Sequence, residues 1–221
     1  MKNINRRTAI KTVLAGGAAL AVSGVSAQSK QSKKNVPAPL KGNIRHSVSK
    51  WCFGNYDLDE FCKICKRIGI ESVELLDPKD WPIVQQNGLT VAMAQGAGLG
   101  IDRAFNDPSL HDELVKSYEE VIPQVAAAGL TNLICFAGKR NGVTDLQGWE
   151  NCEKGLKRIL PIAEKHNVVL TMELLNSVGH KDYLCDHTVW GVELCRRLGS
   201  PNFKLLYDIY HMQIMEGNII E

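Results

Sequence analysis

The chain has 221 residues, of which 44% are hydrophobic and 23% are charged, a balance that excludes collagen-like, coiled-coil and disordered chains. The formal net charge of +2 is unevenly distributed. Seven of the 26 Lys and Arg residues and no Asp or Glu lie in the first 40 positions, which leaves 19 basic against 24 acidic side chains in the rest. Proteins that hold nucleic acid through its phosphates usually have a basic surface, so this mildly acidic body argues against a nucleic-acid partner.

The first 27 residues have the pattern of an export signal. A basic segment, Lys2–Lys11, precedes an apolar run, Val13–Val22, and small residues follow up to Ala27, where a signal peptidase would cut. The run is about half as long as a membrane-spanning helix needs to be. The paired Arg6 and Arg7 resemble the twin-arginine signal of bacteria, although a general secretory signal could also contain two arginines. We expect export to the periplasm and no membrane attachment after cleavage.

The remaining sequence divides into a linker and a body. Residues 28–40 are polar and contain proline, which is typical of a flexible linker, and residues 41–221 form the folded domain. The domain holds all seven cysteines. Cys62 and Cys65 have the spacing of a redox or zinc motif, but no second pair completes a zinc site. We therefore expect all seven to be small buried hydrophobic side chains.

The domain alternates predicted strands and helices. Apolar runs predict strands at 45–51, 72–76, 89–94, 132–137, 168–174 and 203–207. The predicted helices are one that is capped by Asp57 and ends at Gly69, a short one after Pro78, three longer ones at about 111–128, 149–165 and 188–198, and a last one that begins near Met212. Strands that alternate with helices and are apolar throughout predict parallel β-α-β units whose sheet is covered on both faces.

Two α/β architectures accommodate this order, an open doubly wound sheet and a (β/α)8 barrel. A dinucleotide-binding doubly wound sheet would place Gly-x-Gly-x-x-Gly after the first strand, and the sequence has no such motif there. The glycine-rich segment Gly96–Gly100 follows the third strand instead. It is a weak signal for a phosphate-binding loop, and a mobile substrate loop is an equal alternative.

Carboxylates lie at or near the ends of three predicted strands. Glu74 and Glu173 lie within apolar strands, Asp208 closes the sixth strand, and His211 follows three residues later. A carboxylate in an apolar strand is costly unless it is paired, hydrogen-bonded or bound to metal. The carboxyl ends of parallel strands are where barrel enzymes place their chemistry, and these side chains suit Mg²⁺, Mn²⁺ or Zn²⁺. Pairing of each carboxylate with a Lys or Arg of a neighbouring strand is the alternative.

Two segments resemble a known family. Tyr207–Asn218, Tyr-Asp-Ile-Tyr-His-Met-Gln-Ile-Met-Glu-Gly-Asn, is similar to the segment after the sixth strand of hydroxypyruvate isomerases, and Glu173–Asn176, Glu-Leu-Leu-Asn, is similar to the end of their fifth strand. These enzymes are xylose isomerase-like barrels, with ketose 3-epimerases and a class of metal-dependent endonucleases as relatives. The resemblance covers about residues 44–221 and implies a (β/α)8 TIM barrel of which this chain holds about six β-α units.

The resemblance also implies roles for individual residues. The family's matching Glu is a metal ligand and an acid/base, which assigns both roles to Glu173. The matching Asp is a metal ligand, which assigns that role to Asp208, and the matching His lines the substrate site, which assigns substrate binding to His211. The family's remaining ligands follow two further strands, so we expect an incomplete barrel whose activity is reduced or absent.

The implied reaction is the metal-dependent isomerisation of hydroxypyruvate to tartronate semialdehyde, which makes the protein an intramolecular oxidoreductase. Loss of a proton next to the carbonyl gives an enediolate, a divalent ion stabilises it, and carboxylates act as base and acid. Lys139 and Arg140, just after the fourth strand, would attract the substrate carboxylate unless they belong to a solvated loop. Ketose 3-epimerisation by the same chemistry and a non-catalytic binding protein remain alternatives, and so does a homo-oligomer. The expected partner is a small hydroxy-keto acid or sugar.

Overall fold

The computed structural model describes residues 44–217, which lie in one compact unit. The export signal expected over residues 1–27 and the linker expected over residues 28–40 lie outside the described residues. Within the described part, no helix has both the length and the apolar character needed to cross a membrane.

The strands are parallel and follow one another in chain order. The first pair joins β1 to β2, and a second group joins β3, β4 and β5; their bounds are Ser47–Ser49, Ser72–Glu74, Asn132–Cys135, Val169–Glu173 and Phe203–Leu206. The segment Thr90–Ala94 lies between the two groups. It makes single parallel bridges from Thr90 to Ser72 and from Ala94 to both Leu76 and Leu133.

This order decides between the two architectures. A doubly wound sheet reverses its strand order at a switch point, whereas a barrel adds each parallel strand beside the previous one. The six strand segments follow the barrel pattern, so the prediction of a partial TIM barrel is confirmed.

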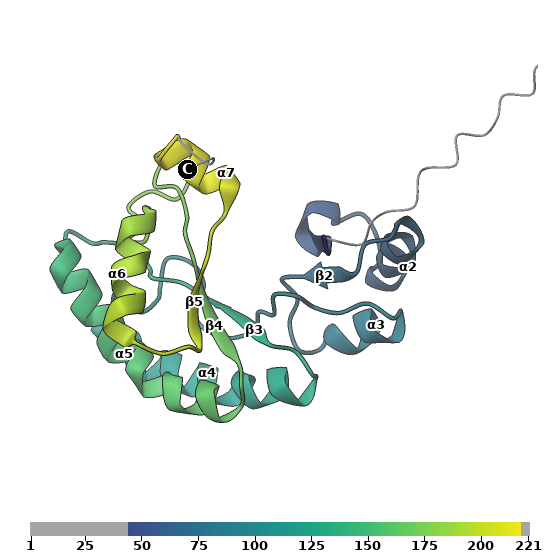
Figure 1. Ribbon diagram of the computed structural model, residues 1–221, viewed down its shortest axis with the longest axis horizontal. Helices are drawn as coiled ribbons and strands as arrows, with labels where there is room; N and C mark the ends of the chain where they lie inside the picture. The colour runs from purple at the N-terminus through teal and green to yellow at the C-terminus, as the bar shows by residue number, and fades with distance from the viewer. Residues whose placement is uncertain (1–43, 218–221) are drawn as a thin grey trace, which may run out of the picture. The chain divides into compact units, whose positions relative to one another are not determined.

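Helices connect the strands and pack on one another along the chain. Figure 1 shows α4, α5 and α6 side by side against β3, β4 and β5, and α4 contacts α5, which contacts α6. The helices are α2 (Leu58–Ile68), α3 (Trp81–Gln86), α4 (His111–Ala127), α5 (Asp145–Lys165), α6 (Thr188–Leu198) and α7 (Ile209–Met215), with 3-10 turns η1 (Lys50–Phe53) and η2 (Pro108–Leu110).

Capping side chains fix several helix starts. The Asp57 carboxylate accepts hydrogen bonds from the backbone of Asp59 and Glu60 at the start of α2, as predicted. The predicted starts of α5 and α7 were too late. Thr144 caps α5 through its hydroxyl, and Asp208 caps α7 through its carboxylate, so each helix begins three or four residues before the predicted position.

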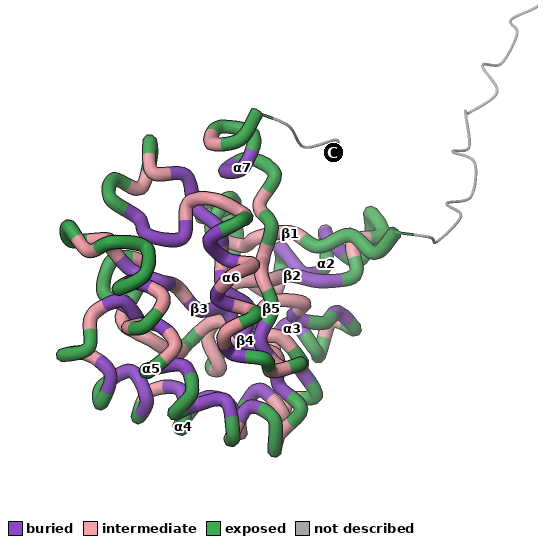
Figure 2. Tube along the Cα trace, turned by 60° about the vertical axis from the view of Figure 1, so that its left-hand side comes forward, coloured by how far each residue is buried: buried purple, intermediate pink, exposed green. Residues whose placement is uncertain are grey.

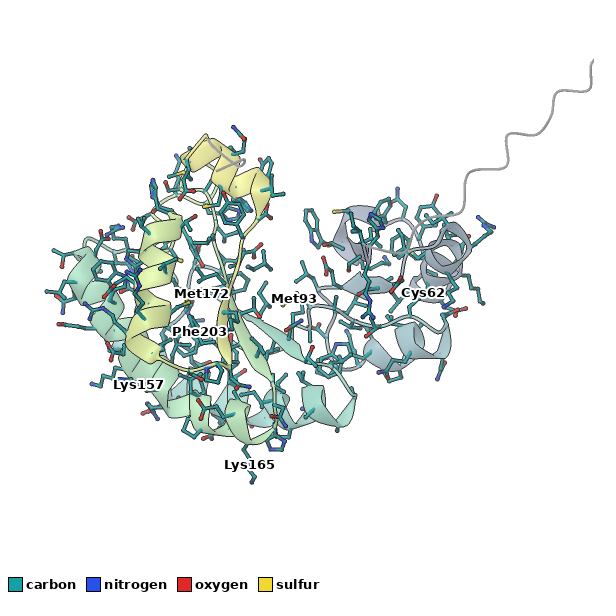
Figure 3. All side chains as sticks on the ribbon, in the orientation of Figure 1. Cys62, Met93, Lys157, Lys165, Met172 and Phe203 are labelled. Carbon is teal, nitrogen blue, oxygen red and sulfur yellow. The ribbon has the colours of Figure 1, made fainter. Side chains whose placement is uncertain are left out.

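The core lies between the strands and the inner faces of the helices. In Figure 2 buried segments run along the strands, while the outer sides of the helices are exposed. Figure 3 shows Met172 and Phe203 inside this layer and Lys157 and Lys165 on the outer side of α5. Met172 and Phe203 are at most 1% exposed, as expected for strands covered on both faces.

The cysteines are free thiols that mostly behave as buried apolar groups. Burial was predicted for all seven and is confirmed for five of them, Cys62, Cys65, Cys135, Cys152 and Cys185. Cys195 is half-buried. Cys52 is exposed because the chain leaves β1 after Ser49 and turns through η1, where the predicted strand continued to residue 51.

Candidate functional site

A cleft of 680 Å³ lies at the carboxyl ends of the strands. Residues at or just after every strand segment contribute to it, together with α7. Its apolar wall includes Trp51, Met93, Phe136 and Tyr210. The carboxyl, imidazole and amide side chains that line it are Glu74, Gln95, Glu173, His180, Asp208 and His211. The cleft therefore combines an apolar wall with a few convergent polar groups, as small-molecule sites do.

Glu173, Asp208 and His211 come together in this cleft. One potential ligand atom from each side chain lies within 4.8 Å of the others. Glu173 is the last residue of β4 and pairs in register with Leu206 of β5, so Asp208 lies just beyond the end of the neighbouring strand. Oxygen ligands from two carboxylates suit a divalent ion such as Mg²⁺ or Mn²⁺. The described residues thus fit the metal that the resemblance implies.

The two oxygens of Asp208 have different partners. Oδ1 accepts hydrogen bonds from the backbone of Tyr210 at 2.8 Å and His211 at 3.3 Å, which caps α7. Oδ2 lies 3.8 Å from Nε2 of His211. The cap holds the carboxylate in place and leaves Oδ2 available to a ligand in the cleft.

Glu173 is the carboxyl group with the most perturbed ionisation in the cleft. Burial raises its pKa to about 7, and the negative charges of Asp208 and Glu74 act in the same direction. Near neutral pH this side chain can therefore be present in either protonation state, which is what a group that removes and returns a proton requires. A bound cation would favour the charged form.

His211 is buried against two aromatic rings. It lies edge-on to His180 and Tyr210, at centroid distances of 5.3 and 5.0 Å. Burial lowers its pKa, although Asp208 opposes this shift. The ring is therefore held in its neutral form, in which one nitrogen donates and the other accepts a hydrogen bond.

A family model described as a xylose isomerase-like TIM barrel matches residues 62–221. The chain belongs to this family. The match covers more than two thirds of the chain and includes Glu173, Asp208 and His211. The resemblance of Tyr207–Asn218 and Glu173–Asn176 to this group of barrels is thereby confirmed at the level of the family.

The individual proteins to which this chain is similar share less than a quarter of its residues. Hydroxypyruvate isomerase of Escherichia coli (strain K12) is 24% identical over 178 residues, which cover 76% of this chain and 69% of that protein. An AP endonuclease of family 2 from Brucella melitensis has a TM-score of 0.70 at 19% identity, covering 79% of this chain and 72% of that one. D-psicose 3-epimerase from Clostridium cellulolyticum H10, solved with D-tagatose, has a TM-score of 0.65 at 16% identity, covering 80% and 67%. These structures establish the barrel fold.

Lys139 and Arg140 lie outside the cleft that holds Glu173, Asp208 and His211. The ammonium group of Lys139 is 2.8 Å from Asp102, and the guanidinium of Arg140 is 2.6 Å from Asp145. Each lines a separate cavity, and neither lines the cleft that holds Glu173, Asp208 and His211. Both cations follow β3, and each is turned toward a carboxylate outside the cleft, so the structure does not bring them to Glu173 and Asp208. The predicted attraction of a substrate carboxylate by these residues stays a prediction.

Sequence reasoning did not assign several residues of the site. Glu74 was one of the costly strand carboxylates, yet no role was attached to it; it lines the cleft just before Leu75, whose φ of 59° is unusual for a bulky residue. His180 lies in the irregular segment after β4, which carries no periodic pattern. Asn176 closes the Glu-Leu-Leu-Asn segment, and its position there was the available signal.

Proposed function

We propose that the protein is a metal-dependent isomerase that moves a carbonyl group between adjacent carbons through an enediolate. The observation that carries this proposal is Glu173, a carboxyl group with a pKa of about 7, beside Asp208 in a cleft at the carboxyl ends of the strands. Hydroxypyruvate is the first candidate substrate. The E. coli hydroxypyruvate isomerase and the resemblance of Tyr207–Asn218 support this choice.

The roles of the residues follow from their positions. Glu173 and Asp208 would hold a divalent ion, which supplies a positive charge that stabilises the enediolate oxygens. Glu173 removes the proton from the carbon next to the carbonyl: burial raises its pKa to about 7 in the metal-free protein, and a bound cation would favour the charged form that accepts a proton. His211 is placed to contact a substrate oxygen, and Phe136 contributes an apolar wall to the cleft.

A ketose is the second candidate substrate. Among the described residues that line the cleft there is no Lys or Arg, while Glu74, Glu173 and Asp208 carry carboxylates. Because no cationic side chain would pair with a substrate carboxylate, and a divalent ion would be the one positive charge in the cleft, a neutral hydroxy-ketone is also accommodated. The fold shared with a D-psicose 3-epimerase is in keeping with this alternative.

Solvent exchange tests the proposal and separates the substrates. The protein, supplied with Mn²⁺ or Mg²⁺ in D₂O, should incorporate deuterium next to the carbonyl of hydroxypyruvate, as followed by NMR. Glu173→Gln should reduce the rate at least about a hundredfold, and Arg140→Gln, outside the cleft, should leave it unchanged. Exchange into a ketohexose alone would assign the ketose substrate. Binding of either compound without any exchange would contradict the proposal and indicate a non-catalytic barrel.

A further inference from the structure

Asn176 surrounds one nitrogen of His211 with hydrogen-bond donors. The backbone N–H of Asn176 donates to Nδ1 of the imidazole at 3.2 Å, and the side-chain Nδ2 lies 2.5 Å from the same atom. The backbone N–H can only donate, so Nδ1 must supply a lone pair. The remaining proton of the neutral ring then resides on Nε2.

The orientation of the Asn176 amide is fixed by a third contact. Its Oδ1 accepts a hydrogen bond from the backbone N–H of Gly179 at 2.6 Å. Because a backbone N–H cannot pair with the amide nitrogen, the side chain cannot be reversed, and Nδ2 must face His211. A Cβ at position 179 would lie 3.2 Å from Oδ1, so the close approach of this backbone favours glycine.

We infer that Asn176 is a positioning residue that holds His211 as the tautomer with its proton on Nε2. In this tautomer Nε2 faces the cleft as a donor and has no lone pair for a metal ion. Although His211 lies within reach of the same point as Glu173 and Asp208, only the two carboxylates remain as ligands among these three. The N–H of Nε2 is directed to an oxygen of the substrate or to Asp208. The consequence for turnover rests on the proposed function; the tautomer itself does not.

The tautomer is measured directly by long-range ¹H–¹⁵N correlation of the imidazoles in the metal-free protein. The spectrum is recorded at mildly alkaline pH, where an ordinary histidine is neutral, and the signal of His211 is assigned by its loss in His211→Gln. We expect a protonated Nε2 and an unprotonated Nδ1. A protonated Nδ1 in the wild-type protein would overturn the inference, whatever the protein's activity.

Asn176→Asp changes the donor that faces Nδ1 into an acceptor while keeping the shape of the side chain and the contact to Gly179. The backbone N–H of residue 176 remains at 3.2 Å, but the new carboxylate oxygen at the closer position of Nδ2 competes with it as an acceptor. We expect the proton to move to Nδ1 and the deuterium exchange of the substrate to slow at least about tenfold, because a donor to the reacting oxygens is lost. The matched control is Asn202→Asp. The side-chain amide of Asn202 also donates a hydrogen bond, to the backbone carbonyl of Val168, but it lies at the opposite ends of the strands, away from His211. The control should leave the His211 spectrum unchanged.

The outcomes separate this inference from the proposed function. An Asn176→Asp protein that folds, as judged by circular dichroism, and keeps Nδ1 unprotonated would show that the side chain of Asn176 does not set the tautomer. If Asn176→Asp does not fold, the wild-type spectrum still tests the tautomer, and Asn176→Ala, which removes the side-chain donor, replaces it as the test of the side chain. A wild-type protein with the expected tautomer but without exchange on any substrate would contradict the proposed function and leave the role of Asn176 intact.

Discussion

The carboxyl group of Glu173 makes the stability of the metal-free protein depend on pH. Its folded-state pKa of about 7 lies above the ordinary value of 4.5, so the folded protein binds more protons than the unfolded chain between these two values. The stabilising contribution is complete below pH 4.5 and is lost as the pH rises through about 7, a loss on the order of 3 kcal/mol. We predict that Glu173→Gln removes this dependence. Urea unfolding in the presence of a chelator at about pH 5 and pH 8 should show that the variant gains stability relative to wild type at the higher pH. If the difference in the free energy of unfolding between the two proteins is the same at both pH values, the assigned burial of Glu173 is contradicted.

A bound divalent ion should stabilise the wild-type protein more than variants that lack one of the two carboxylates. A divalent ion that binds the folded protein through Glu173 and Asp208 stabilises it by mass action. We predict that Mn²⁺ raises the melting temperature of the wild-type protein and has a smaller effect on Glu173→Gln and on Asp208→Asn. Glu193→Gln, on the outer helix α6, should respond like wild type. An equal rise in all four proteins would place the bound metal outside the cleft.

The site residues differ in how far sequence could identify them. Glu173 and Asp208 were identifiable because an apolar strand that carries a carboxylate needs a compensating partner, and parallel strands bring their carboxyl ends together. Lys139 also follows a strand, but its long side chain can turn toward the cleft or away from it. Its pairing with Asp102 depends on a loop that the sequence pattern does not define. His180 reaches the cleft through a similar loop.

At the scale of elements, Glu216, the residue that follows α7, links this helix to the start of α6 by hydrogen bonds. The carboxylate of Glu216 accepts hydrogen bonds from the backbone of Thr188 at 2.6 Å and from its hydroxyl at 3.0 Å. Glu216 thereby caps the start of α6, because the side chain of the N-cap residue His187 makes no capping hydrogen bond. The carboxylate thus lies at the positive end of the α6 dipole, where a negative charge is favourable.

We predict that Glu216→Ala lowers the free energy of unfolding by about 1 kcal/mol, the usual cost of losing an N-cap. Glu216→Gln is the matched control: it keeps an acceptor oxygen, loses the charge and should cost less than the alanine variant. Urea denaturation of the three proteins measures the difference. If alanine and glutamine are equally destabilising, the charge and not the hydrogen bonds would account for the effect.

Element boundaries were less predictable than element order. The helix α6 begins at Thr188 and ends at Leu198, as its apolar spacing and Gly199 predicted. The helix α7 begins earlier than predicted because the side chain of Asp208 turns back to cap it, and this local hydrogen bond leaves no trace in hydrophobic periodicity. The predicted third strand is reduced to the single bridges of Thr90 and Ala94.

For the whole molecule, strand order followed from the sequence because each helix returns the chain to the next parallel strand with one handedness. The absence of a dinucleotide-binding motif counted against one kind of doubly wound sheet, and the family resemblance then implied the barrel; the parallel bridges of Ala94 to both neighbours agree with it. The walls of the cleft were not predictable in this way. Trp51 and Phe136 reach it from segments after β1 and β3, whose paths depend on tertiary packing.

The route by which the protein leaves the cytoplasm is a separate proposal that rests on residues before the described part of the chain. Arg6 and Arg7 precede an apolar run that ends before Ala27, so we predict cleavage near Ala27 and accumulation in the periplasm. Replacing both arginines by lysine keeps the positive charge required by the general secretory pathway but removes the pair that the twin-arginine pathway reads. We therefore expect the variant to remain in the cytoplasm as an uncleaved precursor, as measured by fractionation and N-terminal sequencing. Continued export of the variant would assign the general pathway, and periplasmic wild-type protein that still begins with Met1 would contradict cleavage.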